Sequence, residues 1–396
     1  MTRFAPVGLM VVLAIPGIGL RLSGAHPDPV IQAVVYGVAI LAAAFLLAWA
    51  AEALQVDISQ GLAIALVALI AVLPEYAVDI AFAVRAGNDP SQAPYAIANM
   101  TGANRLLVGI GWPVVFGLFW WKARRYVLEL ERGHAIEVVA LTIATVFSFS
   151  ILFADGITVF HSVVFVVIFI GYVFLIARAP VEDPHLVGPA ETLGSLPAAR
   201  RRLTVGGLIL FAAGAVIASA EPFAESLIGA GVELGIDEFL LVQWVAPFAS
   251  EAPEFLIASL LAVGGRPSAG IGTLVSSKVN QWTLLIASLP IAYALGGGGW
   301  GGLPFDDRQW EELFITAAQS LLAVVLITRL RFAWWGAAML LVLFLVQFFI
   351  PSSDVRMAIA WIYLALAAVV IALRPSAVVW LFRTAREVAA EHGGGG

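Results

Sequence analysis

Apolar stretches of membrane-spanning length follow one another along almost the whole chain. Because the hydrocarbon core of a bilayer is about 30 Å thick, a spanning helix needs roughly 20 predominantly apolar residues. Of the 396 residues, 61% are hydrophobic and only 12% are charged, which excludes a water-soluble fold. The sequence therefore predicts an all-α membrane protein with about twelve transmembrane helices. The predicted spans lie near residues 6–23, 30–51, 60–85, 94–120, 135–154, 157–177, 203–222, 236–263, 267–295, 311–328, 332–350 and 355–373.

The first stretch has two interpretations. Arg3 precedes its apolar run and Leu22-Ser23-Gly24-Ala25 follows it, an arrangement that also resembles a secretory signal peptide. Residues 1–29 are therefore an additional N-terminal helix or a signal-like segment, and we favour the helix.

The basic residues are distributed unequally between the two sides of the membrane. With twelve spans, 15 Lys and Arg residues fall in loops on the side of the termini and four fall on the opposite side. By the positive-inside rule, this asymmetry predicts a multi-pass protein of the inner membrane with both termini in the cytoplasm. The first group comprises Arg3, Lys122, Arg124, Arg125, Arg132, Arg178, Arg200, Arg201, Arg202, Arg266, Arg329, Arg331, Arg374, Arg383 and Arg386.

Several kinds of chemistry have no support in the sequence. There is no Cys, and none of the five His belongs to a pair with metal-ligand spacing. The chain also lacks a G-x-x-x-x-G-K-[ST] loop and a His-Glu-x-x-His motif. We therefore expect neither an enzyme nor a bound cofactor. The expected partners are inorganic cations and the lipid bilayer, not nucleic acid.

A polar connection divides the chain into two halves. Residues 179–202 contain four prolines and three consecutive arginines, and we predict a cytoplasmic linker there. The first half is predicted at 30–178 and the second at 203–350. Residues 351–396 are predicted to form an additional helix and a cytoplasmic tail.

The two halves contain related segments. A Pro-Glu pair lies within an apolar span in each half, at Pro74-Glu75 and Pro253-Glu254, and an Asn follows in the next span. Asn104 comes 29 residues after the first glutamate and Asn280 comes 26 after the second. Because five membrane crossings separate the copies, they must run in opposite directions. Transporters with such inverted repeats bind their substrates near the midplane, on helices interrupted by Pro or Gly.

The residues of these segments suit a cation. A carboxylate in the bilayer is costly, so an intramembrane Glu is a functional candidate. Each proline also leaves the carbonyl four residues earlier, on Ile70 and Ala249, without its helical donor. Carboxylates and carbonyls are the ligands that hard cations accept. We therefore predict Glu75 and Glu254 as metal ligands, although a proline kink beside a protonated glutamate is the simpler alternative.

Other polar residues near these glutamates are predicted to complete the cation site. Asp79 follows Glu75 by one turn and Glu251 precedes Glu254 by one turn, so each pair shares a helical face. The asparagines would add amide oxygens, although Asn also joins membrane helices without any functional role. The predicted additional ligands are Asn104, Asn280, Glu251, Asp79, Thr101, Ser250, Ser276 and Ser277.

At these segments the chain resembles the calcium/cation antiporter superfamily, which includes sodium/calcium and calcium/proton exchangers. Its members read roughly G-[ST]-[ST]-x-P-E in one helix and G-N-x-x-G-S-N in the next. The chain has Ile70-Ala71-Val72-Leu73-Pro74-Glu75 and Ala98-Asn99-Met100-Thr101-Gly102-Ala103-Asn104 in the first copy. The second copy reads Ala249-Ser250-Glu251-Ala252-Pro253-Glu254 and Leu274-Val275-Ser276-Ser277-Lys278-Val279-Asn280. The resemblance implies a core of ten helices, with one further helix at each end, and Glu75 and Glu254 as central cation ligands.

The departures from these motifs bear on the choice of ion. Ala71 and Val72 replace both hydroxyl positions of the first copy, and Glu251 replaces one in the second, so sodium sites are depleted. Lys278 and Arg105 place positive charge beside the predicted ligands, and a buried ammonium repels a cation at 4 Å by about 4 kcal/mol per unit charge, which disfavours a divalent ion most. We expect Arg105 to pair with Glu75 or Asp79.

The sequence therefore predicts a secondary antiporter of small inorganic cations that works by alternating access. Exchange of Ca²⁺ for Na⁺ follows from the resemblance. The alternatives are a cation/proton exchanger, in which Lys278 is a built-in cation, and an exchanger fold that acts as a sensor without transport.

Overall fold

The computed structural model describes residues 4–57, 70, 72–177 and 186–390. This part of the chain is almost entirely helical, and the prediction of an all-α membrane protein is confirmed. Within it, nine helices are long and apolar enough to cross a membrane, and they coincide with nine of the twelve predicted spans. Of the other three, 60–85 lies partly outside the described residues, 267–295 is interrupted by π-helical turns, and 332–350 contains a helix of only 16 residues.

The chain forms two compact units, each of which draws on both halves of the sequence. Unit 1 comprises Met1–Phe82 and Val181–Leu256, and unit 2 comprises Ala83–Pro180 and Ile257–Gly396. The division falls inside two helices, α4 (Leu73–Asn88) and α11 (Glu238–Val263). The two helices that carry the Pro-Glu pairs therefore each contribute to both units.

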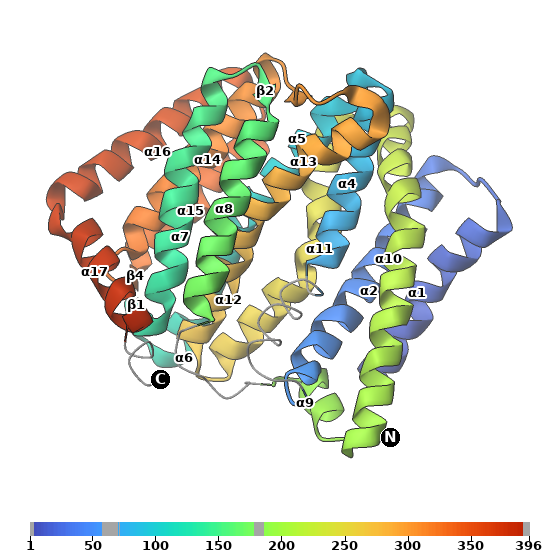
Figure 1. Cartoon of the computed structure of the whole chain (residues 1–396), viewed down its shortest axis with the longest axis horizontal. Helices are drawn as coiled ribbons and strands as arrows, with labels where there is room; N and C mark the ends of the chain where they lie inside the picture. Colours follow the sequence, from blue (N-terminus) through green and yellow to red (C-terminus); the bar gives the residue numbers. More distant parts are fainter. Residues whose placement is uncertain (1–3, 58–69, 71, 178–185, 391–396) are drawn as a thin grey trace. The chain divides into compact units, whose positions relative to one another are not determined.

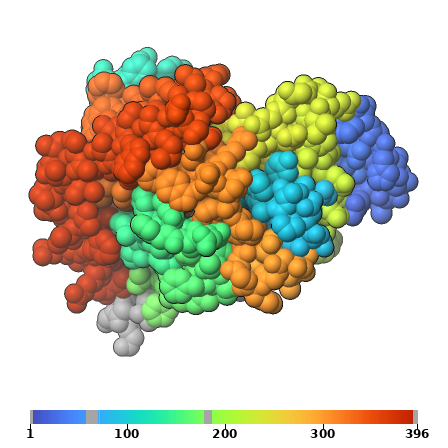
Figure 2. All heavy atoms as spheres, turned by 90° about the horizontal axis from the view of Figure 1, so that it is seen from above, coloured from blue at the N-terminus to red at the C-terminus, as the bar shows by residue number. Residues whose placement is uncertain are grey.

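Unit 1 is built on the long helices α2 (Pro29–Leu54) and α10 (Ala198–Leu234), and α1 (Ala5–Ser23) packs against both (Figures 1 and 2). Small residues allow these helices to approach closely, as in other membrane helix pairs. A Cβ atom added to Gly17 would lie 2.5 Å from the Cβ of Ala39. One added to Gly37 would lie 2.9 Å from the ring of Phe223.

The predicted linker contains more helix than expected. A short helix, α9 (Pro189–Gly194), lies within it, and α10 begins at Ala198, so the three arginines are helical. The span predicted at 203–222 ended too early, because α10 continues through Pro222 to Leu234. Phe223, Ala224, Leu227 and Ala230 bury one face of this extension, and that packing outweighs the hydrogen bond that the proline removes.

An ion pair joins the end of α2 to the start of α10. Asp57 accepts hydrogen bonds from Nε and Nη2 of Arg201 at 2.6 and 2.8 Å, and from Nε of Arg202 at 2.9 Å. These hydrogen bonds, chiefly those from Arg201, lower the pKa of Asp57 to about 2. The ionised carboxylate is therefore the form that stabilises unit 1.

We expect this ion pair to weaken in acid. The folded pKa of Asp57, about 2, lies below the value of about 3.9 for an unfolded chain, so its stabilisation is complete above about pH 5 and falls as the pH approaches 2. After allowance for solvent screening, Asp57→Asn should cost about 1–2 kcal/mol at pH 6 and about half of that at pH 3. Thermal unfolding in detergent at the two pH values measures this difference. Asp155→Asn, in an exposed turn, is the control, and an equal cost of Asp57→Asn at both pH values would contradict the prediction.

Unit 2 holds most of the remaining helices, with α14 at its centre. In an 18-residue apolar stretch of α14, 83% of the residues are buried, and the helix packs against α5, α7, α15 and α16 (Figure 1). The helices of this unit are α5 (Ala93–Leu106), α6 (Trp112–Ala123), α7 (Ala135–Ser148), α8 (Val159–Ile176), α12 (Pro267–Asn280), α13 (Ile286–Tyr293), α14 (Asp307–Ile327), α15 (Trp334–Phe349), α16 (Ser353–Leu373) and α17 (Ser376–Ala390). Shorter turns are the 3-10 helices η2 (Pro90–Gln92), η4 (Arg132–His134) and η5 (Phe149–Phe153) and the π-helices η3 (Leu107–Gly111), η6 (Gln281–Leu285) and η7 (Ala294–Gly298).

Two short antiparallel strand pairs connect loops from different halves of the sequence. β1 (Val127–Glu129) pairs with β4 (Arg331–Ala333), and β2 (Gly156–Ile157) pairs with β3 (Leu303–Pro304). They are small exceptions to the all-α prediction.

The segment predicted as a tail contains another helix. α17 is amphipathic and packs against α7 with a buried face formed by Ala377, Leu381, Ala385 and Val388. The spacing of these residues by three or four positions is that of a surface helix. Composition alone concealed this helix, because its charged face lowers its mean hydropathy below that of a span.

Candidate functional site

The first Pro-Glu pair lies at the start of the described part of α4. Pro74 occupies the first turn, where its missing N–H costs no helical hydrogen bond. Glu75 follows in the same turn, where the helix dipole favours negative charge. Glu75 is 4% exposed and Asp79, one turn later, is fully buried. The first copy therefore contributes two buried carboxylates from one helical face to unit 1.

The second Pro-Glu pair lies in the interior of α11. Because Pro253 has no N–H, the carbonyl of Ala249 lacks its helical donor. Glu251 is buried, whereas Glu254 is half-buried, and Oε2 of Glu254 has no hydrogen-bond partner among the described residues. Carbonyl and carboxylate oxygens on one stretch of helix are a suitable donor set for a hard cation.

Two of the predicted hydroxyl ligands bond to their own helices. Oγ of Ser250 lies 3.2 Å from the carbonyl oxygen of Pro247, to which it donates. Oγ1 of Thr101 donates to the carbonyl of Ile97 at 2.7 Å. A hydroxyl that donates its hydrogen in this way keeps lone pairs for a cation, so these bonds leave both residues as candidates.

Asn104 lies near the end of α5 and is fully buried. Its Nδ2 donates to the carbonyl of Met100 at 2.9 Å, and its Oδ1 has no hydrogen-bond partner within the described part of the chain. The amide is thus held with its oxygen as the available group, which is the orientation that a cation ligand requires.

Both asparagine-bearing helices run directly into a π-helical turn. α5 continues as η3, which starts three residues after Asn104, and α12 continues as η6, which starts immediately after Asn280. π-helical turns are rare and occur frequently at functional sites. A π-helical turn that starts one to three residues after the asparagine in each copy agrees with the internal repeat inferred from the sequence.

Lys278 connects the two asparagine-bearing helices. Its ammonium is fully buried and Nζ donates to the backbone carbonyl of Asn104 at 3.1 Å. It also lies 4.5 Å from the ring centroid of Trp282, within the range of a cation–π contact. Unit 2 therefore places the amino group of Lys278 beside the backbone of Asn104, as the sequence suggested.

Ser276 and Ser277 differ in their surroundings. Oγ of Ser276 lies 2.8 Å from the hydroxyl of Tyr172 on α8, so it takes part in a hydrogen bond between helices. Ser277 is half-buried. Tyr172 was not predicted as a site residue, because one tyrosine in an apolar span carries no recognisable signal.

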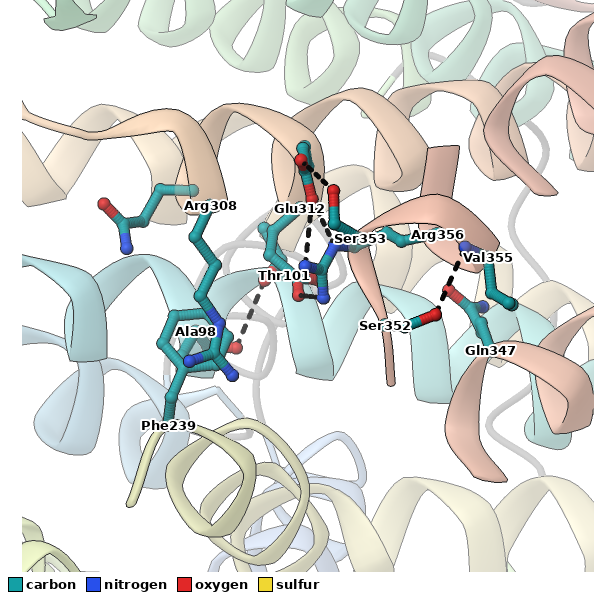
Figure 3. Close-up of polar contacts among 12 residues, drawn as sticks. Ala98, Thr101, Phe239, Arg308, Glu312, Gln347, Ser352, Ser353, Val355 and Arg356 are labelled. Carbon is teal, nitrogen blue, oxygen red and sulfur yellow. Dashed lines mark hydrogen bonds and ion pairs between the residues drawn. The ribbon is translucent and has the colours of Figure 1, made fainter. Parts of the chain in front are cut away.

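Arg105 belongs to a buried network of charges in unit 2, of which Figure 3 labels Glu312, Gln347 and Arg356. Its Nη1 donates to Oε1 of Gln347 at 3.0 Å, and its Nη2 forms an ion pair with Glu312. The other carboxylate oxygen of Glu312 accepts from Arg356 at 2.9 Å, and Arg356 also pairs with Glu311 at 2.9 Å. The network joins α5 to α14, α15 and α16.

The structure identifies Glu312 as a partner of Arg105 that the sequence analysis did not name. Arg105 was expected to pair with Glu75 or Asp79, the carboxylates of the first Pro-Glu helix. Arg105 reaches Glu312 because α14 packs against α5. The hydropathy of the sequence does not predict which helices pack together.

Two further polar residues were overlooked. The side chains of Asn99 and Gln281 are fully buried, and neither has a hydrogen-bond partner among the residues described. Asn99 lies one helical turn and one residue before Asn104, and Gln281 directly follows Asn280. The available signal was polarity within an apolar span, and Asn99 stands in the quoted G-N-x-x-G-S-N segment.

No group of three or more His, Asp or Glu side chains is close enough to hold a metal ion in residues 4–57, 70, 72–177 and 186–390. A cavity of about 1050 Å³ in unit 2 is lined by residues that include Lys122, Arg125 and Arg266, and by none of the predicted ligands. The assignment of cation ligands therefore depends on residue chemistry and on the repeat.

Comparison with solved structures gives close and distant relatives. The H⁺/Ca²⁺ exchanger CAX is 38% identical with a TM-score of 0.93, and the match covers 98% of this chain and 99% of that one. The exchanger YfkE is 15% identical with a TM-score of 0.61, covering 90% and 99%. The sodium-calcium exchanger NCX_Mj is 16% identical with a TM-score of 0.52, covering 86% and 99%. The last two show the fold alone.

Comparison of sequences gives a family. No curated protein sequence matches the chain. The model of the family described as sodium/calcium exchanger protein matches residues 29–178 and 204–352, one range in each half of the chain. Because these ranges cover most of the sequence, the chain belongs to the sodium/calcium exchanger protein family, within the calcium/cation antiporter superfamily that its motifs resemble.

Proposed function

We propose that this membrane protein exchanges Ca²⁺ for protons. The observation that carries the proposal is the similarity to the H⁺/Ca²⁺ exchanger CAX, at 38% identity over almost the full length of both chains. The loss of hydroxyl groups at Ala71, Val72 and Glu251 adds support, because sodium sites are depleted of ligands. Coupling to protons, in contrast, requires only carboxylates that bind either a proton or a cation.

Glu75 and Glu254 are the proposed exchange groups. Each carboxylate binds Ca²⁺ when ionised and carries a proton when the cation has left, so the two ions compete for the same oxygens. Asn104 and Asn280 supply amide oxygens, and the carbonyl of Ala249 adds a backbone ligand. Asp79 and Glu251 add negative charge that offsets desolvation of the cation.

Lys278 has a fixed role in this proposal. Its ammonium is held by the carbonyl of Asn104 and the ring of Trp282, and this charge limits the number of cations that the ligands accept. Coulomb repulsion of about 4 kcal/mol per unit charge at 4 Å is sufficient to exclude a second cation from its vicinity.

Flux in proteoliposomes tests the exchange. Vesicles that contain the purified protein and a pH-sensitive dye should release internal protons when Ca²⁺ is added outside without Na⁺, and empty vesicles should not. Uptake of ⁴⁵Ca that requires an outward Na⁺ gradient, with no proton movement, would instead identify a sodium/calcium exchanger. Absence of both fluxes would favour the non-transporting sensor.

We also propose an inner-membrane location with both termini in the cytoplasm, based on the distribution of basic residues. Because the chain has no Cys, single cysteines can be introduced without background labelling. Ala390→Cys should react with a membrane-impermeant maleimide only in inside-out vesicles, and Asp155→Cys only in right-side-out vesicles. The reverse pattern would invert the topology.

A further inference from the structure

One face of α12 carries a series of polar contacts from its first turn to Asn280. Ser268, Gly272, Ser276 and Asn280 are each four residues apart, so they form a stripe that winds slowly around the helix. At a rise of 1.5 Å per residue, the stripe extends over about 18 Å.

The stripe begins at an open cavity. Ser268 lines the cavity of about 1050 Å³ in unit 2, together with Glu131 and Arg266. Oγ of Ser268 accepts a hydrogen bond from the backbone N–H of Glu131 at 2.9 Å. The cavity brings solvent to the first turn of α12.

One turn further, the ring of His134 lies directly on the backbone of α12. A Cβ atom added to Gly272 would be 2.0 Å from Cε1 of His134, so the absence of a side chain at Gly272 makes this contact possible. Nδ1 of His134 is 2.6 Å from Oε2 of Glu137, and both side chains are mostly buried. Imidazole and carboxylate groups in contact form a unit that accepts and releases protons readily.

The next turn meets a hydroxyl pair. The hydroxyls of Tyr172 and Ser276 are 2.8 Å apart. α7, which carries Glu137, packs against both α8 and α12 (Figure 1). Ser276 is followed, again after one turn, by Asn280.

We propose that His134, Glu137, Tyr172 and Ser276 form a proton relay between the cavity and the Asn280 end of α12. This inference rests on the proposed exchange of Ca²⁺ for protons. Each imidazole or hydroxyl accepts a proton on one side and releases another on the opposite side, so one proton moves and no group is changed at the end. In this proposal, water molecules bridge the gaps between these groups, because a hydrogen bond through a bridging water is nearly as favourable in enthalpy as a direct one. The relay gives protons a route that Ca²⁺ does not use, since one carboxylate and two mutually bonded hydroxyls are too few oxygen ligands for this cation.

Measuring two modes of transport distinguishes a proton relay from a merely structural role of these residues. Ca²⁺-driven proton release requires the relay, whereas exchange of ⁴⁵Ca for unlabelled Ca²⁺ at equal pH moves no protons. Tyr172→Phe removes only the hydroxyl and should lower proton release about tenfold or more, given that positioned proton-transfer groups contribute about 10²–10⁴-fold and water can substitute in part. ⁴⁵Ca/Ca²⁺ exchange should stay within about twofold of wild type, since the proposed ligands are untouched.

Two variants complete the experiment. Tyr293→Phe removes another buried tyrosine hydroxyl of unit 2 and should leave both modes unchanged. His134→Gln retains a hydrogen-bonding group without a transferable imidazole proton and should reproduce the defect of Tyr172→Phe, which covers the case in which one variant fails to fold. Proton release by both relay variants at the wild-type rate would overturn the relay and leave the proposed exchange intact. An equal loss of proton release and of ⁴⁵Ca/Ca²⁺ exchange in these variants would do the same. Absence of Ca²⁺-driven proton release from the wild type would overturn the relay together with the exchange.

Discussion

Replacing Glu254 by Gln is expected to abolish Ca²⁺-driven proton release, with a decrease of at least about 100-fold. The change preserves the shape of the side chain but removes both the charge that binds Ca²⁺ and the oxygen that carries the proton. Glu75→Gln should have an effect of the same size, because the inverted repeat gives the two residues equivalent positions. The measurement is the initial rate of proton release from dye-loaded proteoliposomes.

Matched substitutions define what this result means. Glu129→Gln alters a glutamate of unit 2 whose side chain is 73% exposed and paired with Arg331, and it should transport as the wild type does. Glu254→Asp keeps the charge and shortens the reach, so its rate should be intermediate. Retention of more than about one third of the wild-type rate by Glu254→Gln would remove this residue from the exchange groups.

The largest loss of stability is expected from Glu312→Ala. Glu312 is buried between Arg105 and Arg356, and its removal leaves two guanidinium groups with Glu311 as the remaining carboxylate of the network. Loss of one partner from a buried ion pair typically costs about 3–5 kcal/mol, because an uncompensated charge stays in a low-dielectric interior. Equilibrium unfolding in detergent, followed by circular dichroism, measures this cost.

An exposed ion pair provides the comparison. Arg132 and Glu387 are 2.9 Å apart with side chains 61% and 50% exposed, so Glu387→Ala should cost less than about 1 kcal/mol. Combining Glu312→Leu with Arg105→Leu should recover part of the stability lost in Glu312→Ala, since the buried charge and its partner are removed together. A cost for Glu312→Ala no greater than that for Glu387→Ala would show that the network does not stabilise unit 2.

The sequence predicted the membrane class, most spans and the family because these depend on local properties. Twenty apolar residues cross a bilayer wherever they pack, and Pro-Glu within such a stretch is conspicuous because it is costly. The order of the repeat elements was likewise visible, since Glu75 with Asn104 and Glu254 with Asn280 recur at nearly constant spacing.

Properties that depend on packing were not visible. Glu312 lies 207 residues from Arg105 in the sequence, and only the contact between α5 and α14 brings them together. The continuation of α10 through Pro222 depends on the apolar face that follows the proline. The contact of His134 with Gly272 similarly requires the backbone of α12 to be in place, because neither residue belongs to a recognisable motif.

The π-helical turns after α5 and α12 determine the direction in which the asparagines point. Such a turn contains one residue more than the α-helix would need. Deleting a residue from Leu107–Gly111 would allow an ordinary helix to form, and Asn104 would then rotate by about 100° relative to α6. The side-chain amide of Asn104 would then point in a different direction, although every polar side chain was still present. The length of this segment, more than its composition, thus sets the orientation of Asn104, and η6 does the same for Asn280 in the opposite copy.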